Sequence, residues 1–234
     1  MNINNFIEEL KKIDIEITET QLNQLEKYYE LLVQYNEKMN LTGITEKEQV
    51  YLKHFYDSLT MNKIIDLNEV KTLCDVGTGA GFPGLVIKIL FPNIDVTLVD
   101  SLNKRIDFLN IVIKELNLDG ISTLHSRIED FGKNTREKYD VVTARAVAPL
   151  NILLEYCIPL VKTGKCFIPL KANISREILE IEKAKKELKF ELVEKKEFRL
   201  PLEESVRTIL KFQKNEKTNK KYPRPYSQIK KKPL

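Results

Sequence analysis

The sequence predicts an α/β protein built on a mainly parallel, Rossmann-like sheet. From residue 70 onward, short runs rich in β-branched residues alternate with helical stretches, and this alternation favours parallel strands joined by helices. A glycine-rich turn, "GTGAGFPG", directly follows the first of these runs. Before residue 65, apolar residues instead recur three or four apart, which indicates helices.

We expect seven strands, at residues 70–76, 94–100, 121–125, 139–143, 165–170, 190–200 and 206–212. The last two flank "RLPLEES", which is typical of a turn or hairpin connection. The chain should therefore divide into an N-terminal helical lobe (residues 1–65), a Rossmann-like domain with a seven-stranded sheet (residues 66–213) and a basic C-terminal tail (residues 214–234).

Two helix starts are predicted within the lobe. Thr18 with Gln21, and Thr45 with Glu48, have the spacing of a capping box, in which each side chain bonds the other residue's backbone N–H. The first of these precedes a long amphipathic stretch that runs through Leu32.

Composition fits one substantial core in a cytoplasmic protein. The chain has 234 residues, of which 42% are apolar and 31% charged, and its start lacks the basic and then apolar pattern of a secretory signal. No apolar run reaches the roughly 18 residues that a membrane span needs. Cys74, Cys157 and Cys166 form no CxxC pair and there are only two histidines, so we expect buried thiols and no metal site.

Positive charge is concentrated at the C-terminus. Residues 211–234 hold nine Lys or Arg and one acid, so this segment carries +8 while the rest of the chain carries −4. Its prolines and sparse apolar residues indicate that it cannot fold alone. Lysines interleaved with Tyr222 and Tyr226 are suited to RNA, because they can neutralise phosphates and stack on unpaired bases. Deleting residues 215–234 is expected to weaken RNA binding much more than binding of a small ligand.

The glycine turn fits two motifs. Gly79-x-Gly81-x-x-Gly84 matches the dinucleotide fingerprint, whereas Asp75-x-Gly77-x-Gly79-x-Gly81 matches the S-adenosylmethionine loop of methyltransferases. Pro83 suits the first turn of a helix, so the tight turn should lie before it, with Gly84 inside the helix as a packing residue.

Charge favours the second motif. A carboxylate at Asp75 disfavours a pyrophosphate, but it suits the ammonium and sulfonium of S-adenosylmethionine. Asp100 closes the next strand, "VTLVD", where it could accept hydrogen bonds from ribose hydroxyls in either kind of site. Glu129, in "HSRIEDF", follows the third strand at the rim expected for an adenine, and Ile128 could cover the face of that base.

The sequence also limits the acceptor of the methyl group. After the fourth strand stands "TARAVAPL", without the Asn/Asp-Pro-Pro-aromatic run that orients exocyclic amines, and no Pro-Cys pair offers a covalent thiolate. Guanine N7 needs neither, since its lone pair is free at pH 7 and no proton has to leave. Proximity and alignment would then suffice.

These runs resemble the RsmG (GidB) family of bacterial 16S ribosomal RNA guanine-N7 methyltransferases. The resemblance covers nearly the whole chain, through "NLTGIT", "LKHFYDSL", "DVGTGAGFPG", "TLVDSLNKR", "YDVVTARAVA", "PLVK" and "KKYPR". It implies direct transfer from S-adenosylmethionine to 16S RNA, alone or in the small ribosomal subunit, by a protein that we expect to be monomeric.

The resemblance further implies which residues surround the donor. Gly77 and Phe82 would contact it from the glycine loop; Asp100, Ser101 and Leu102 would lie at its ribose, and Ile128 and Glu129 at its adenine. Relatives usually carry a small residue where this chain has Ile128, which would tighten the pocket. After "KKYPR" the chain continues "PYSQIKKKPL", where the family often has Lys-Pro-Gly. The resemblance therefore does not give the geometry of this segment.

Three polar residues keep more than one interpretation. The resemblance places Arg145 at the donor or the substrate, and on physical grounds this arginine could instead hold an RNA phosphate, stack on the target base or form a surface ion pair. His54 and Asp57 lie on one helical face, where they could line the target cleft or, as we favour, satisfy each other within the packing.

Three other functional classes remain as alternatives. An NAD-dependent dehydrogenase would need the Gly79 reading, a plain RNA-binding module would leave the glycine loop idle, and a methyltransferase for another RNA position or a non-RNA substrate would keep the fold.

Overall fold

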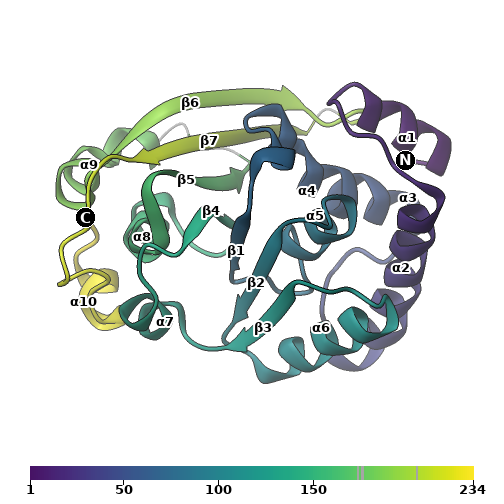
Figure 1. Ribbon diagram of the computed structural model, residues 1–234, viewed down its shortest axis with the longest axis horizontal. Coiled ribbons are helices and arrows are strands. Elements are labelled where there is room, and N and C mark those ends of the chain that lie inside the picture. The colour runs from purple at the N-terminus through teal and green to yellow at the C-terminus, as the bar shows by residue number, and fades with distance from the viewer. Residues whose placement is uncertain (173, 175–176, 204) are drawn as a thin grey trace.

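A computed structural model of the chain describes residues 1–172, 174, 177–203 and 205–234. Its centre is one seven-stranded sheet (Figure 1). The strands are Thr72–Val76 (β1), Asp95–Asp100 (β2), Ile121–His125 (β3), Tyr139–Arg145 (β4), Val161–Lys171 (β5), Phe190–Arg199 (β6) and Val206–Lys214 (β7). All seven predicted strands are confirmed. β5 begins four residues before the predicted start. The prediction missed these residues because Lys162, Thr163 and Gly164 are polar or lack a side chain and so give little strand signal.

The order of the strands is β3-β2-β1-β4-β5-β7-β6. β1 to β5 pair in parallel, whereas β7 runs antiparallel to both β5 and β6. The chain builds outward from β1 through β2 to β3, and then returns to place β4 on the other side of β1. Ligands of open α/β sheets bind outside the carboxyl ends of the strands at such a reversal. A ligand is therefore expected beside the residues that follow β1 and β4.

The helices cover both faces of the sheet. They are Ile3–Lys11 (α1), Glu19–Met39 (α2), Lys47–Val50 (α3), Asp57–Leu59 (α4), Gly84–Leu90 (α5), Asn103–Glu115 (α6), Ile128–Asn134 (α7), Leu150–Cys157 (α8), Glu182–Leu188 (α9) and Tyr226–Lys231 (α10). Shorter helical turns are Tyr51–Tyr56, which is π-helical, and Thr60–Lys63, Leu67–Glu69, Ile158–Leu160 and Glu177–Glu180, which are 3-10.

Alternate strand residues belong to two separate cores. Leu73 and Val141 lie in the core under α5 and α6, while their neighbours Cys74 and Val142 lie in the core under α8 and α9. This alternation is what a period of two produces when both faces of a sheet are buried. Cys74, Cys157 and Cys166 are buried free thiols, as the sequence predicted.

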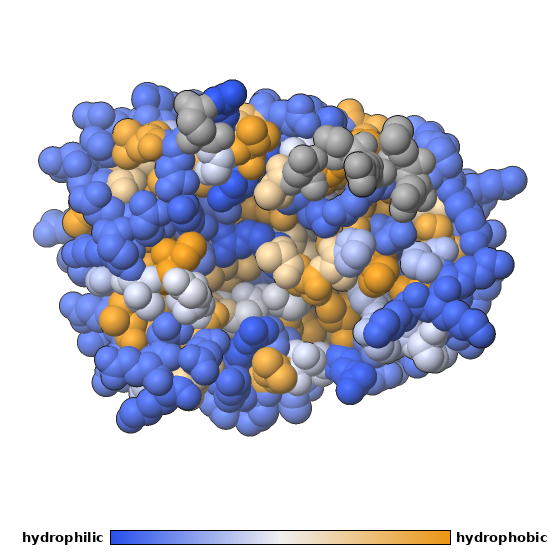
Figure 2. Space-filling view, turned by 180° about the vertical axis from the view of Figure 1, so that it is seen from behind, coloured by the Kyte–Doolittle hydropathy of each residue, from blue (hydrophilic) through white to orange (hydrophobic). Residues whose placement is uncertain are grey.

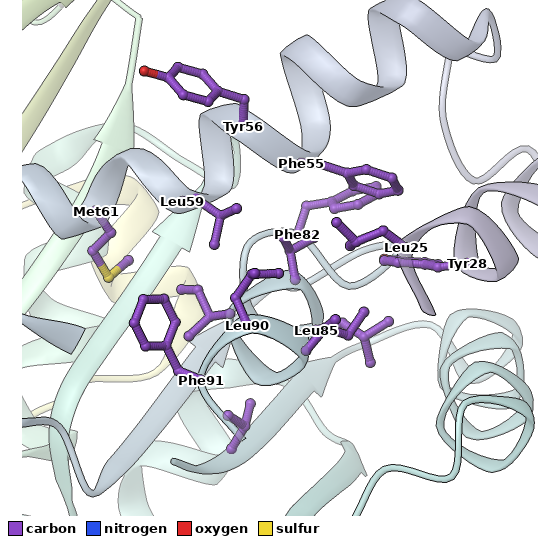
Figure 3. Packing of buried hydrophobic residues seen from close by; sticks show 14 of the residues in the cluster. Leu25, Tyr28, Phe55, Tyr56, Leu59, Met61, Phe82, Leu85, Leu90 and Phe91 are labelled. Atoms are coloured by element: carbon purple, nitrogen blue, oxygen red, sulfur yellow. The ribbon is translucent and has the colours of Figure 1, made fainter. Parts of the chain in front are cut away.

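The N-terminal helices pack on α5 and share its core. Tyr28 of α2 stacks with Phe55 and with Phe82 of the glycine loop, with ring centroids 5.5 Å apart in both pairs (Figure 3). Gln21 of α2 donates to the carbonyls of Ile89 and Leu90 at the end of α5. These contacts hold α2 and the helical turn that carries Phe55 against α5 and the glycine loop. The division of the chain at residues 65 and 213 stays a prediction.

One of the two predicted helix starts is confirmed and the other is wrong. Thr18 and Gln21 form the capping box before α2. The helix α3 instead begins after Glu46, whose carboxylate accepts from the backbone N–H groups of Glu48 and Gln49. A carboxylate satisfies two free N–H groups at once and complements the helix dipole, which a threonine hydroxyl at residue 45 cannot do.

The C-terminal segment, residues 214–234, folds against the rest of the chain and does not need a partner to become ordered. Tyr222, Ile229 and Leu234 are buried in the core that contains α8. A short segment with few apolar residues gains this order because its few apolar side chains enter a core already formed by the sheet. Figure 1 shows α10 beside α7 and α8, at the opposite side of the molecule from α1.

The described residues contain no helix with the length and apolarity that a bilayer crossing requires.

Candidate functional site

The glycine loop after β1 is a tight turn held on β2. The N–H groups of Gly77 and Thr78 both donate to the carbonyl of Val99, at 2.8 and 3.1 Å. Gly77 has φ +69°, and a Cβ there would stand 2.6 Å from Val147 Cγ2 in the loop after β4. Only glycine allows both the backbone conformation and this close contact.

Gly84 serves packing, as predicted. It is the first residue of α5, and a Cβ on it would stand 2.5 Å from Leu98 Cδ2 and 2.8 Å from Asp75 Cβ. Because this glycine is used inside the protein, it does not bring the backbone close to a pyrophosphate. The third glycine of the dinucleotide motif Gly79-x-Gly81-x-x-Gly84 is therefore not available to a dinucleotide.

Asp75 lies completely buried beneath the loop. Its Oδ2 accepts from Thr78 Oγ1 at 2.6 Å and from the Gly84 N–H at 2.8 Å, while its buried Oδ1 has no partner. Burial raises the pKa of this carboxyl to about 6, against the lowering effect of the two hydrogen bonds. The orphan oxygen fits a ligand that brings a positively charged donor to this turn.

Asp100 ties the loop to the end of β2. Its Oδ2 accepts from the Gly79 N–H at 2.9 Å and from Arg105 at 3.2 Å, and its Oδ1 accepts from the Leu102 N–H at 2.9 Å. The residue is 2% exposed. Three of about four acceptor positions of the carboxylate are thus used inside the protein. The predicted role at a ribose stays a prediction, with one acceptor position on Oδ1 left for it.

The structure brings four predicted site residues together in one cavity of about 740 Å³, which we name the tail-side cavity. It is lined by Ser101, Leu102, Arg127, Ile128, Glu129, Val147, Ala148, Pro149, Ile152, Tyr156, Tyr226 and Lys230. Leu102, Ile128 and the loop after β4 supply much of its apolar surface. Glu129, at the start of α7, lies 3.9 Å from Arg127 as a loose ion pair. An apolar cavity with a few polar groups suits a nucleoside.

Arg145 lines a second cavity, of about 490 Å³, which we name the arginine cavity. Its lining is Ile44, Lys53, His54, Asp57, Arg145, Ala146, Leu170, Lys171, Ala172, Glu177 and Arg207. Residues 146–149, which follow β4, therefore stand between the two cavities, with Ala146 on one side and Val147 to Pro149 on the other. The face seen in Figure 2 is hollowed near its middle, and both hydrophilic and hydrophobic residues surround the hollow.

The guanidinium of Arg145 is held on three sides. It donates to the carbonyl of Lys53 at 3.1 Å, to Asp57 Oδ2 at 3.2 Å and to His54 Nδ1 at 3.3 Å. It also lies over the ring of Phe82, 5.2 Å from the centroid. Arg145 is therefore a mostly buried, positioned cation and not a surface ion pair.

His54 is neutral in this setting. Burial and the nearby Arg145 lower its pKa to about 3. Since Nδ1 accepts from Arg145, the proton sits on Nε2, which lies 2.8 Å from Thr42 Oγ1. The ring stacks on Phe82 with centroids 4.4 Å apart. The favoured prediction that His54 and Asp57 satisfy each other is wrong, because both instead contact Arg145 and both line the arginine cavity.

Asp57 connects two distant strands. Its Oδ1 accepts from Arg207 Nε of β7 at 2.9 Å, and its Oδ2 accepts from Arg145 of β4. Sequence reasoning did not find Arg207, Lys53 or Lys171 as site residues. Arg207 lies 150 residues from Asp57, and a single arginine in a strand gives no sequence signal of such a meeting.

Sheet order, glycine loop and strand-end acids together define a class I S-adenosylmethionine-dependent methyltransferase. Solved structures share this fold. TYW2 from M. jannaschii, solved in complex with AdoMet, has TM-score 0.52 and 15% identity over 63% of this chain and 70% of that chain. The YcgJ protein from Bacillus subtilis has TM-score 0.54 and 12% identity over 70% of this chain and 100% of that chain.

The family follows from closer relatives. Residues 21–209 match the GidB family, described as rRNA small subunit methyltransferase G, and the chain belongs to this family. A relative named ribosomal RNA small subunit methyltransferase G, from Lysinibacillus sphaericus, is 53% identical over 96% of this chain and 95% of its own. Relatives of the same name are 52% identical in Exiguobacterium sibiricum, over 100% of both chains, and in Bacillus subtilis, over 96% of this chain and 95% of that one.

Proposed function

We propose that this protein transfers a methyl group from S-adenosylmethionine to N7 of a guanine in 16S ribosomal RNA. Family membership supports methyl transfer to small-subunit RNA. The choice of N7 is supported by one observation in the arginine cavity, which is that its possible general bases are already engaged.

Three of the described residues that line this cavity could in principle accept a proton. His54 has a pKa of about 3, so it is too weak a base at neutral pH. Asp57 accepts from two arginines, and Glu177 Oε2 accepts from Lys171 Nζ at 2.8 Å and from the Leu150 N–H at 2.7 Å. If the atom that receives the methyl group had to lose a proton, none of these three side chains could readily take that proton. Guanine N7 has no proton to lose.

The protein's task is then to position two substrates. When bound, S-adenosylmethionine supplies a methyl carbon on a positively charged sulfur, and the N7 lone pair displaces that sulfur in line, with no proton transferred. We propose that the donor occupies the tail-side cavity and the adjoining turn, where Asp75, Gly77, Gly79 and Phe82 form the bend.

The adenosine part of the donor is assigned to the rim of the same cavity. Asp100, Ser101 and Leu102 would meet the ribose, and Ile128 and Glu129 the adenine. The fit is supported by the orphan Oδ1 of Asp75, which can accept from an ammonium group.

The target nucleotide is assigned to the arginine cavity. Arg145 and Arg207, oriented by Asp57, have further N–H groups for the base or its phosphate, and Lys53 and Lys171 add two cations at the same place. Phe82, stacked under His54, stiffens the wall that carries Arg145. Orientation of the base rather than proton transfer would supply most of the rate.

The test is mass spectrometry of nucleosides from 16S RNA after incubation with the protein and a labelled donor. Naked 16S RNA and intact small subunits should be compared as substrates, and aniline cleavage at the modified guanine locates the position. Label in 7-methylguanosine is the expected result. Label in another nucleoside, or none in either RNA substrate, would contradict the proposal.

A pH profile tests the absence of a general base. If no proton moves, kcat should change little between about pH 6.5 and 9. A rise in kcat with slope one in this range would indicate a titrating base and would exclude the proposed mechanism.

A further inference from the structure

The C-terminal segment forms part of the wall of the tail-side cavity. Tyr226 and Lys230 of α10 line it together with Ile128 and Glu129 of α7. We propose that Tyr226 packs against the adenosine part of the donor, and that the segment thereby couples donor binding to RNA binding. This inference rests on the proposed function, because it takes S-adenosylmethionine and RNA as the two ligands.

A buried ion pair anchors the segment to α8. Glu155 is fully buried, and it accepts from the Arg224 N–H at 2.9 Å, from Arg224 Nε at 2.8 Å and from Arg224 Nη2 at 2.6 Å. Such a bidentate pair fixes both the distance and the angle between the two groups. The chain just before α10 is therefore held rigidly.

A second attachment reaches the helix that carries the adenine-side residues. Pro223 packs on Gly132 of α7, where an added Cβ would stand 2.9 Å from Pro223 Cγ. Arg136, which follows α7, donates to the carbonyl of Thr218 at 2.7 Å and also to that of Tyr222. Since Ile128 and Glu129 begin α7, a displacement of the segment would disturb them as well.

The sequence of α10 divides its faces. Tyr226 and Lys230 lie four residues apart, one turn along the same face, and this face borders the cavity. Ile229 points into the core and is fully buried. Tyr226 is 47% exposed, so its ring has surface left to bury against a planar ligand. A tyrosine offers such surface at a low entropy cost and is well suited to stack on an adenine.

The same segment presents free positive charge. Lys214, Lys221 and Arg224 are used in ion pairs within the protein. Among the described residues, no acid pairs with the remaining lysines of the segment, which are Lys217, Lys220, Lys230, Lys231 and Lys232. Lys230 Nζ lies over the ring of Tyr226, 5.9 Å from its centroid, so the other four are the freest of these cations. RNA phosphates would engage these lysines and hold α10 in place, which stiffens the wall that Tyr226 forms. Coupling of this kind is reciprocal, so the donor must also tighten RNA binding.

The experiment measures donor affinity by calorimetry with the full-length protein. Tyr226→Ala should weaken binding of S-adenosylmethionine about five- to tenfold, the size expected for loss of one stacking contact, whereas Tyr226→Phe should bind like the wild type. Gln228→Ala, an exposed position on the same helix but outside the cavity lining, should leave donor affinity unchanged. Unchanged thermal melting of the Tyr226→Ala variant would show that the loss is not one of folding.

The second arm adds 16S RNA at saturation. Wild-type protein should bind the donor several times more tightly with RNA than without, and Tyr226→Ala should lose most of this gain. Equal donor affinity of Tyr226→Ala and wild type would overturn the inference. Failure of the proposed function would look different, since donor affinity would still depend on Tyr226 while no 7-methylguanosine formed.

Discussion

The two cavities at the carboxyl edge of the sheet are built in opposite ways. The tail-side cavity is lined largely by apolar side chains and by the backbone ends of β2, α7 and the loop after β4, with three charged residues at its edge. The arginine cavity is lined by six charged residues drawn from four parts of the chain, and Asp57 joins two of them, Arg145 and Arg207. The first combines local turns with the anchored C-terminal segment, whereas the second depends on ion pairs between distant segments. Substitutions should therefore separate them.

The strongest separation is expected from Asp57→Ala. Arg145 and Arg207 would be left mostly buried without their counterion, and breaking a buried pair in this way costs about 3–5 kcal/mol of stability. Methylation should fall by about 100-fold or more, because the two arginines lose their orientation. Donor affinity, which we propose to reside in the other cavity, should change less than about twofold at temperatures where the variant is folded. Urea denaturation, calorimetry and methyl transfer measure the three quantities.

A matched control is Asp130→Ala, the same change at an exposed ion pair with Lys133. It should cost less than about 1 kcal/mol. Equal losses of donor affinity and of methyl transfer in Asp57→Ala would show that the two cavities are not independent.

The loop between the cavities can be tested through Gly77→Ala. The new Cβ would face Val147 at 2.6 Å in a residue with φ +69°, so both strain and a clash arise. Gly79→Ala has the same kind of φ, +61°, but meets nothing within 4 Å, so it carries the strain alone, about 1–2 kcal/mol. Thermal or urea unfolding should show a clearly larger loss for Gly77→Ala, together with weaker donor binding.

Adding Val147→Ala separates the two causes. The double variant Gly77→Ala, Val147→Ala should return to about the stability of Gly79→Ala once the cost of Val147→Ala alone is subtracted. No recovery would mean that the backbone conformation at residue 77, and not the contact across the loop, sets the loss.

The buried carboxyl of Asp75 beneath the glycine loop predicts that stability depends on pH. Its pKa is raised to about 6 from 3.8 because it is buried. Between these values the folded protein keeps a proton that the unfolded chain has released, so this group lowers stability as pH rises through the window, by up to about 3 kcal/mol. Asp75→Asn keeps an acceptor for Thr78 and Gly84 without the charge.

The measurement is the difference in unfolding free energy between Asp75→Asn and wild type, followed from pH 4 to 7. It should shift in favour of the variant as pH rises and level off above about pH 7. A flat difference would show that Asp75 titrates normally in the folded protein. Donor binding by the variant should still be weaker, because the amide cannot pair with an ammonium.

Local sequence patterns were enough to predict the sheet and the glycine turn after β1, but they did not predict the arginine cavity. The strands and Gly84 follow from local patterns, since a change of period and a proline at a helix start are visible in short windows. The helix start predicted at Thr45 was wrong because capping depends on which nearby side chain reaches the free N–H groups of the helix. In α3 that side chain is Glu46. Arg207 and Glu155 are single residues in ordinary strand and helix sequences, and their meaning arises only when the fold brings them to Asp57 and Arg224. Long-range ion pairs leave no periodic signal.

The smallest expected effect comes from the lysines at the end of the tail. Lys231→Ala should lower the salt dependence of RNA binding, with the slope of log K against log salt falling by about 0.7–0.9 because one phosphate contact is lost. Lys27→Ala, which removes an exposed lysine from α2 on the far side of the molecule, should leave the slope unchanged (Figure 1). Filter binding of 16S RNA between 50 and 200 mM salt, roughly the range in which such contacts dominate, measures both variants. If both slopes equal that of the wild type, the C-terminal segment does not contact RNA phosphates through this lysine, and the positive charge of the arginine cavity alone must attract the RNA.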